Sequence, residues 1–281
     1  MTSEAGKPVS DMEEWPAGMK IVNGHLAKDI REQGMIQPPN SFGYIHLAAE
    51  VERPHPLKRN SAEKKALLAS LKTAAAALRA AEPERVQRVD LFDAFVIPPG
   101  SKEGRELIAR SGYDVHLAAF DIVVLVECSD VDTARSVRDS EAFVTIQNLL
   151  TEGASHTHCF VGSNAKRIAE VDHDRDGIFL FNYFYAADIA AKGADGIDIL
   201  LGVWEYTAGW WTAYANLTNS TPLQPVAGEK SDYSLINHCR WDRLADILPH
   251  LLFRPSLGRF VLANFTANDI MAMPILYRLA K

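Results

Sequence analysis

The stretch from Gly177 to Tyr185 constrains the fold most, because it is the clearest strand in the chain. Its residues are mostly aromatic or β-branched, the types that strands favour, and one polar residue, Asn182, stands among them. The strand follows a charged run from Asp172 to Asp176. Run and strand together divide the chain into two halves with the same order of elements. The sequence therefore predicts a duplicated fold.

The first half has the order strand, helix, strand, repeated once. Apolar residues recur at helical spacing after Asn60-Ser61, a pair that can cap a helix, and Pro83 ends this pattern. The expected strands of this half are 43–51, 86–97, 115–127 and 155–161. The expected helices are 62–81 and 131–150.

The second half repeats this order. Arg254-Pro255 interrupts its last helical segment, since proline cannot continue a helix and restricts the residue before it. Pro274 is tolerated in the last strand only at an edge or a strand start. The expected strands are 178–185, 223–226, 233–241 and 272–279. The expected helices are 197–217, 242–250 and 256–265.

Two βαββαβ units in tandem are two ferredoxin-like motifs. The sequence thus predicts an α+β fold with a partly ordered N-terminal arm (1–41), a first unit (42–170) and a second unit (171–281) with the active-site cleft. The duplicated pattern, the aromatic strand Phe181-Asn-Tyr183 and the Pro255-Ser256 break resemble the dimeric α+β barrel superfamily. In that group two ferredoxin-like sheets pack face to face as a barrel, and here one chain would supply both.

The resemblance implies a small-molecule enzyme. The superfamily includes cofactor-free monooxygenases, isomerases and cyclases, haem-binding chlorite dismutases and dye-decolourising peroxidases. The Gly-x-x-Asp-Gly signature of the last group is absent from this sequence. The resemblance leaves the cofactor open between none, haem and a divalent metal.

Composition narrows the function classes. A net charge of −7 argues against nucleic-acid or anionic-membrane partners, which require a basic face. The three cysteines have no CxxC spacing, which favours reduced thiols in a cytoplasmic protein. The first forty residues lack the apolar region of a signal peptide, and no apolar run approaches the roughly 20 residues of a membrane span. No phosphate loop and no Gly-x-Ser-x-Gly motif is present, so nucleotide-dependent and serine-hydrolase chemistry lacks support.

The first candidate site lies in the second half. His238 and Asn182 are expected near the middle of adjacent strands, with His238 as acid or base near neutral pH. Asn182 and Tyr183 would position it, and Glu205 would be a second acid or base. The expected walls of this substrate cleft, which would take an aromatic or apolar molecule, are Trp204, Trp211, Asn237 and Phe253. The alternative is that His238 is a core histidine with satisfied hydrogen bonds.

Two further hypotheses concern metals. A second cluster in the first half combines four histidines on three expected strands, a composition that suits zinc, iron or copper. These are His46, His116, His156 and His158. The alternative is a polar patch inside the barrel. For haem, His250 is the residue with a plausible helical position, but a histidine at a helix C-terminus also interacts favourably with the helix dipole.

The sequence therefore predicts a cytoplasmic enzyme that performs histidine acid–base chemistry on a small aromatic or apolar substrate. A haem- or metal-dependent oxidoreductase of the same fold is the second hypothesis, and a non-catalytic ligand-binding or assembly module is the third. The helix with Trp204, Tyr206, Trp210, Trp211 and Tyr214 has too many aromatic residues for one buried face. We expect part of it to pack on the other half or on the second subunit of a homodimer.

Overall fold

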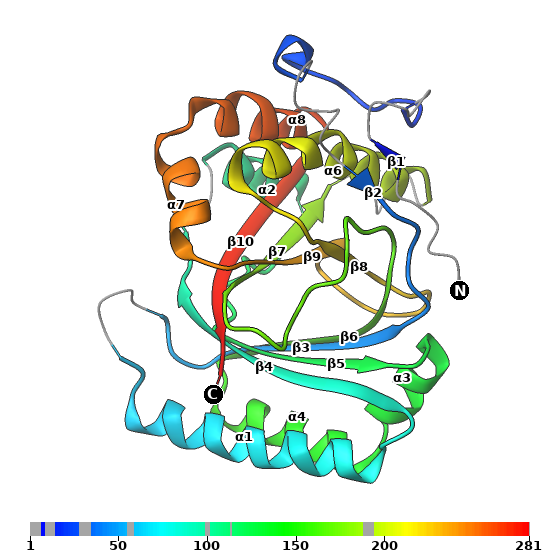
Figure 1. Ribbon diagram of the computed structural model, residues 1–281, viewed down its shortest axis with the longest axis vertical. Coiled ribbons are helices and arrows are strands. Elements are labelled where there is room, and N and C mark those ends of the chain that lie inside the picture. Colours follow the sequence, from blue (N-terminus) through cyan, green and yellow to red (C-terminus); the bar gives the residue numbers. More distant parts are fainter. Residues whose placement is uncertain are drawn as a thin grey trace.

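The computed structural model describes residues 7–8, 15–27, 35–54, 59–98, 102–112, 114–187 and 194–280. Within these ranges, eight antiparallel strands form a closed barrel (Figure 1). The first four strands are β3 (Gly43–Glu50), β4 (Val86–Val96), β5 (Ile122–Cys128) and β6 (His156–Asn164). The other four are β7 (Ile178–Ala186), β8 (Thr221–Pro225), β9 (Leu235–Trp241) and β10 (Ile270–Leu279). A short separate sheet pairs β1 (Lys7–Pro8) with β2 (Met35–Ile36).

The strand order shows the duplication. It reads β4-β5-β3-β6 and then β8-β9-β7-β10, so each half has its strands in the order second, third, first, fourth. This is the order of a ferredoxin-like βαββαβ unit. The barrel closes where the last strand of each unit pairs with the second strand of the other, β6 with β8 and β10 with β4. The predicted tandem ferredoxin-like architecture is confirmed.

Helices cover the barrel on two opposite sides (Figure 1). Beside the first sheet lie α1 (Ala62–Ala81), α3 (Val131–Arg138) and α4 (Glu141–Gly153). Beside the second lie α6 (Ala194–Ala215), α7 (Leu244–Phe253), the π-helix η4 (Leu257–Leu262) and α8 (Ala263–Ala267), while α2 (Lys102–Ser111) contacts β10. Three apolar clusters result: one between each sheet and its helices, and one inside the barrel.

Capping residues set several helix boundaries. The Ser61 hydroxyl accepts a hydrogen bond from the Lys64 N–H and begins α1, as the sequence predicts. The helix expected over 131–150 is two helices instead. Asp130 caps α3 through the Thr133 N–H at 2.7 Å, and Ser140 caps α4 through the Phe143 N–H at 3.3 Å. A second capping side chain therefore starts a new helix inside the predicted one.

The long strand expected over 115–127 begins only at Ile122. The buried carboxylate of Asp121 causes the late start. It accepts hydrogen bonds from the Val51 and Glu52 N–H groups at 2.6 and 3.1 Å, which fixes a turn in front of β5. Residues 114–121 lack strand pairing and place Phe120 among the side chains of the barrel interior.

Pro274 lies within β10, opposite Asn182 of β7. Pairing of β10 with β4 begins only at Leu276. The proline therefore occupies a position with a strand neighbour on one side, which removes the need for its missing N–H.

Part of the aromatic helix α6 packs against the N-terminal part of this chain, a neighbour that the sequence did not predict in addition to the other half or a second subunit. Trp15 packs edge-on against Tyr206, with ring centroids 5.3 Å apart. Gly202 lies so close to Pro16 and Met19 that a Cβ there would be within 3.0 Å of both. Two asparagine side chains bind this segment. Asn264 of α8 forms hydrogen bonds with the backbone N–H and C=O of Val22, and Asn268, the C-cap of α8, does the same with Lys20.

Candidate functional site

Strand register decides which predicted site residues face one another. In the pairing of β7 with β9, Phe181 lies opposite His238 and Asn182 lies opposite Asn237. Paired residues share a face and neighbours along a strand alternate, so His238 and Tyr183 point into the barrel while Asn182 and Asn237 point toward the helices. The residues of the first candidate cluster are therefore divided between two faces of the sheet.

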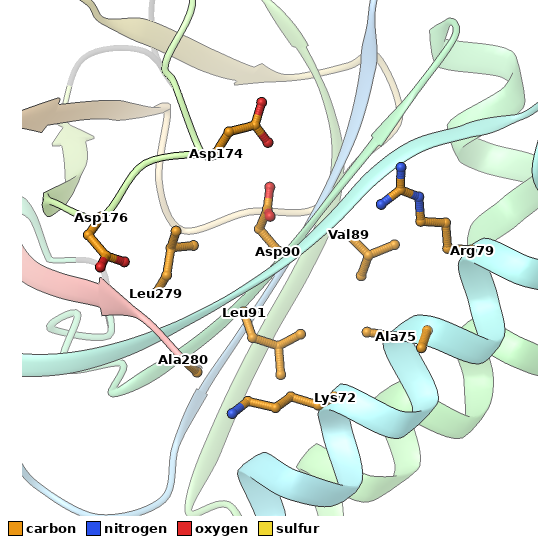
Figure 2. Close-up of a pocket in the computed structure, with 11 residues that line it drawn as sticks. Lys72, Ala75, Arg79, Val89, Asp90, Leu91, Asp174, Asp176, Leu279 and Ala280 are labelled. Atoms are coloured by element: carbon orange, nitrogen blue, oxygen red, sulfur yellow. The ribbon is translucent and has the colours of Figure 1, made fainter.

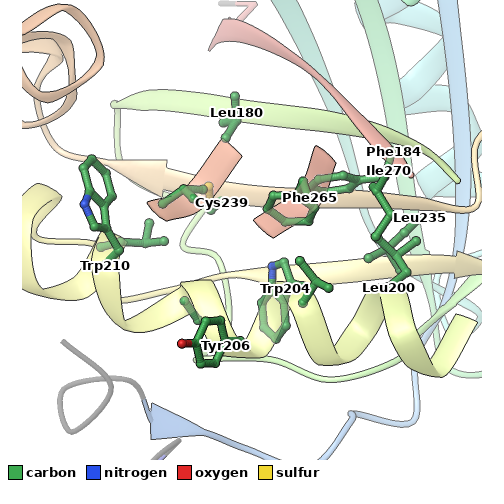
Figure 3. Packing of buried hydrophobic residues seen from close by; sticks show 14 of the residues in the cluster. Leu180, Phe184, Leu200, Trp204, Tyr206, Trp210, Leu235, Cys239, Phe265 and Ile270 are labelled. Atoms are coloured by element: carbon green, nitrogen blue, oxygen red, sulfur yellow. The ribbon is translucent and has the colours of Figure 1, made fainter. Parts of the chain in front are cut away.

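The helix-facing side is a packed core and not a substrate cleft. Trp204 is 5% exposed, and Leu200, Leu235 and Cys239 around it are at most 1% exposed (Figure 3). Trp211 packs between Trp210 and Trp241, at ring-centroid distances of 4.9 and 6.2 Å. These rings contribute to stability through apolar burial, about 2–3 kcal/mol for a fully buried large side chain.

The remaining residues predicted on this side also lie apart from His238. Glu205 is buried and forms an ion pair with Lys166, and burial raises the pKa of its carboxyl group. Asn237 accepts a hydrogen bond from the Ser220 hydroxyl at 2.7 Å. Phe253 is 79% exposed at the end of α7 and lines no cleft with these residues.

His238 instead belongs to a hydrogen-bonded relay with two residues that the sequence pattern did not indicate. The Nε2 atoms of His238 and His173 are 2.7 Å apart. The Nδ1 atom of His173 is 2.6 Å from Asp90 Oδ2. We call Asp90, His173 and His238 the relay. It combines β4, the segment 165–177 between the two units, and β9.

Hydrogen-bond partners fix the protons of the relay. The Leu180 carbonyl, 3.3 Å from His238 Nδ1, can only accept, so this nitrogen carries hydrogen. His238 Nε2 then accepts from the His173 Nε2–H, and one proton lies between His173 Nδ1 and Asp90. Burial and the neighbouring His173 lower the pKa of His238 well below its usual value, which keeps its ring neutral. Each of the two hydrogen bonds of the relay therefore contains one hydrogen.

The segment 165–177, called the mouth segment here, closes the end of the barrel where the relay lies. Asp174 of this segment bonds to Arg88 at 2.6 Å, and the carbonyls of Arg175 and Asp176 accept from the Arg240 guanidinium. The His173 side chain is only 5% exposed. The relay is thus covered from bulk water by the mouth segment, except near Asp90.

A cavity of about 530 Å³ opens beside Asp90 (Figure 2). One side is helix α1, with Lys72, Ala75, Ala76 and Arg79. The other side is formed by β4, the end of β10 and the mouth segment, with Val89, Asp90, Leu91, Asp174, Asp176, Leu279 and Ala280. Asp90 is the member of the relay that lines this cavity.

Glu127 adds a second titratable group at this end of the barrel. It lies opposite Arg88 of β4 and Tyr44 of β3, and therefore on the inner face. Burial and the nearby Glu170 raise its pKa to about 7. This carboxyl group can exchange a proton near neutral pH.

The four histidines predicted as a metal set lie deeper in the barrel and at its far end. They form two pairs rather than one cluster: His116 stacks on His156 at 3.6 Å between ring centroids, and His46 lies edge-on to His158 at 6.3 Å. Tyr183 approaches His46 Nε2 at 3.4 Å and not His238. In the described ranges, no group of three or more His, Cys, Asp and Glu side chains is arranged to hold a metal ion.

The candidate haem ligand does not fit either. An axial histidine must offer a free nitrogen to an apolar cavity. His250 lies in the last turn of α7 beside Arg254, next to the exposed Leu252 and Phe253, and lines neither this cavity nor the second one of about 520 Å³ beside Lys64. No step proposed below passes through haem.

Sequence reasoning missed Asp90 and His173. Both carried a signal. Asp90 follows Arg88 at the strand spacing of two, so a charged pair precedes Phe92 on one face of the strand. His173 stands in the charged run that served only as a boundary between the halves.

The chain is similar to solved structures at the level of the fold. No protein-family description matches the sequence, and no curated protein matches it either. Among solved structures, an anthrone oxidase-like protein is similar over 88% of this chain and 94% of its own, with a TM-score of 0.57 and 11% identity. A chlorite dismutase mutant from Candidatus Nitrospira defluvii covers 86% of this chain and 91% of its own, with a TM-score of 0.46 and 10% identity. A dimeric protein of unknown function and ferredoxin-like fold from Bacteroides fragilis covers 44% of this chain and 96% of its own, with a TM-score of 0.29 and 12% identity.

Fold and strand order together define the class. The chain has the dimeric α+β barrel fold, in which two ferredoxin-like units, here both in one chain, supply the sheets. Among the described residues, every helix is too short or too polar to span a lipid bilayer.

Proposed function

We propose that this protein is a small-molecule enzyme that removes a proton from a substrate bound in the cavity beside Asp90. The observation that carries the proposal is the relay, whose two short hydrogen bonds connect the cavity wall to a neutral imidazole inside the barrel. An acid–base group placed next to a cavity and connected to further bases is typical of proton-transfer sites.

Each relay member has a distinct role. Asp90 lies in the cavity wall and accepts the proton of the substrate. His173 shares a proton with Asp90 and stabilises its charge. His238 is the positioning residue: its Nε2 accepts from His173 and holds that ring in one tautomer, while stacking on Phe181 at 4.1 Å fixes its own ring.

The reaction class is proton abstraction from an acidic O–H or C–H group, as isomerases, cyclases and cofactor-free monooxygenases perform. The fold supports this class, since the anthrone oxidase-like protein shares the architecture over most of both chains. General acid–base catalysis contributes a factor of roughly 10² to 10⁴ in rate.

Deuterium exchange tests the proposal without a known substrate. Enolisable and phenolic aromatic compounds are incubated with the protein in D₂O, and loss of their acidic C–H signals is followed by NMR. We expect catalysed exchange with at least one compound, and a decrease of roughly 10²-fold or more in Asp90→Asn and His173→Ala. His250→Ala, outside the relay, is the matched control and should exchange like the wild type. Equal rates in all four proteins would refute the proposal.

A second candidate is a non-catalytic binding module. The observation that favours it is the filled interior of the barrel, where aromatic rings and histidines contact one another. Phe92, for example, touches His173, Phe179, Phe181 and His238 at ring-centroid distances of 5.1 to 5.5 Å. Ligand binding in the cavity without any deuterium exchange would support this candidate.

A further inference from the structure

The carboxylates around the cavity beside Asp90 are already engaged. Asp90 is bound to His173, and Asp174 is bound to Arg88 at 2.6 Å. Asp176 also has an interaction partner. Two of the three carboxylates on this side of the cavity, Asp90 and Asp174, are therefore paired with nitrogen-bearing side chains of the protein.

The two cations on the other side are not compensated in this way. Lys72 and Arg79 both line the cavity from α1, and no ion pair joins either of them to another side chain in the described part of the chain. The uncompensated charge that faces the cavity is thus positive, although the protein as a whole has a net charge of −7. This local reversal of sign favours an anionic ligand.

Lys72 and Arg79 stand at the two ends of the α1 side of the cavity. Lys72 and Arg79 lie about two helical turns apart on α1, on either side of Ala75 (Figure 2). Ala76 lies between them on the same side of the cavity. The two alanines leave room between the long flexible side chains. Leu91 of β4 lies across from them and adds an apolar wall. An anionic group with an apolar body matches this lining.

We propose that the cavity selects substrates that carry an anionic group, such as a carboxylate on an aromatic body, held by Lys72 and Arg79. The acidic hydrogen of the substrate then lies toward Asp90. This inference rests on the proposed function, and names the substrate class of the same site.

Binding of benzoate and of its neutral analogue benzamide, measured by NMR titration at low ionic strength, tests the inference. We expect wild-type protein to bind benzoate roughly five-fold or more tightly than benzamide. Lys72→Met and Arg79→Met should each weaken benzoate binding about two- to five-fold, as for a single exposed ion pair, and the double variant should lose the preference. Lys65→Met, which removes an exposed cation on the same helix outside the cavity, is the matched control. Ala76→Trp, which fills the cavity, should block both compounds.

Failure of the inference differs from failure of the proposed function. Equal affinity for the two compounds, no benzoate binding, or a preference that survives in the double variant would overturn the inference, even if Asp90 variants abolish deuterium exchange. A benzoate preference that persists in Asp90→Asn, with no deuterium exchange in the wild type, would support the inference on the ligand and overturn proton transfer.

Discussion

The Nε2 atoms of His173 and His238 lie 2.7 Å apart, although the residues are 65 positions apart in the chain. His173 belongs to the connection between the two units, His238 to the second unit, and Asp90 to the first. The relay therefore exists only when both units close into one barrel. A single ferredoxin-like unit of this chain would not contain it.

Replacement of His238 by Phe separates hydrogen bonding from packing. The phenyl ring retains the stacking on Phe181 and removes the acceptor of the His173 N–H. We expect a loss of about 1–3 kcal/mol in the free energy of unfolding, the cost of an unsatisfied buried donor. His238→Ala should cost about 1–2 kcal/mol more, because it also leaves a cavity. Urea denaturation of both variants measures the difference.

NMR spectroscopy gives an independent check of the hydrogen bond between His173 and His238. In the wild type, the Nε2–H of His173 donates to His238 Nε2, and the ring of His238 has its hydrogen on Nδ1. ¹⁵N spectra of the imidazoles should show this tautomer, and His238→Phe should alter the His173 signals. Unchanged His173 signals in that variant would contradict the hydrogen bond.

Stability should fall on acidification because several histidines are buried in neutral form. Burial, followed by the neighbouring His156 and His116, lowers the pKa of His158 to about 4. Between an unfolded-state pKa of about 6.5 and the folded value, only the unfolded chain binds this proton, so folding stability is lost as the pH falls through that range. His158 alone accounts for a loss on the order of 3 kcal/mol at pH 4, and the lowered pKa values of His46 and His238 act in the same direction.

Urea denaturation at several values between pH 7.5 and pH 4 checks this dependence. Above pH 6.5 both states hold His158 neutral, and stability should not change through this group. His158→Gln removes one titrating group and should make the loss shallower by about one proton. A variant with the same pH slope as the wild type would show that His158 is not buried in neutral form.

Sequence periodicity predicted the architecture because the individual elements have clear patterns, such as the helical spacing in α1 and the aromatic strand β7. The order of these elements is the same in both units. The same periodicity could not predict the site, because neighbouring residues of a strand lie on opposite faces of the sheet and the exact register decides which residues meet. His238 and Asn182 lie on adjacent strands as expected, but the register pairs His238 with Phe181. The contact between His173 and Asp90 depends on the path of the mouth segment, which has no periodic pattern. Both residues carried a signal in the sequence, Asp90 as a charged residue within a strand and His173 within the charged run, but neither signal indicated that the two are in contact.

The burial of Lys64 is a second feature that the sequence did not predict, because a lysine on a helix is normally exposed. Here its side chain is 1% exposed, and its Nζ lies 2.7 Å from both Asp121 Oδ2 and Asp93 Oδ1. Although burial opposes it, pairing with these carboxylates raises the pKa of Lys64. Its burial follows from the turn at Asp121, which helical spacing does not encode.

Lys64→Met should destabilise the protein by about 3–5 kcal/mol, the cost of leaving a buried charge without its partner. Lys64→Met combined with Asp121→Asn should recover part of this loss, because the second change removes one uncompensated carboxylate. Lys65→Met is exposed on the same helix and should stay within about 0.5 kcal/mol of the wild type. Chemical denaturation of the three proteins gives the comparison. A Lys64→Met protein as stable as Lys65→Met would contradict the buried ion pair.

Replacing either of two glycines by alanine should change the stability of the protein in opposite directions. Gly43 begins β3 against the N-terminus of α3, and a Cβ at this position would be 2.5 Å from the carbonyl carbon of Asp130 and 2.7 Å from Val131 Cα. Both contacts are with backbone, which cannot move without displacing α3 from the sheet. Gly43→Ala should therefore cost about 1–3 kcal/mol or more. Gly258, in η4, has no atom within 4 Å of such a Cβ, so Gly258→Ala should leave stability unchanged or raise it by about 0.5–1 kcal/mol. Thermal and urea denaturation of the two variants side by side measures both effects, and equal stabilities would mean that β3 and α3 do not pack as closely as described.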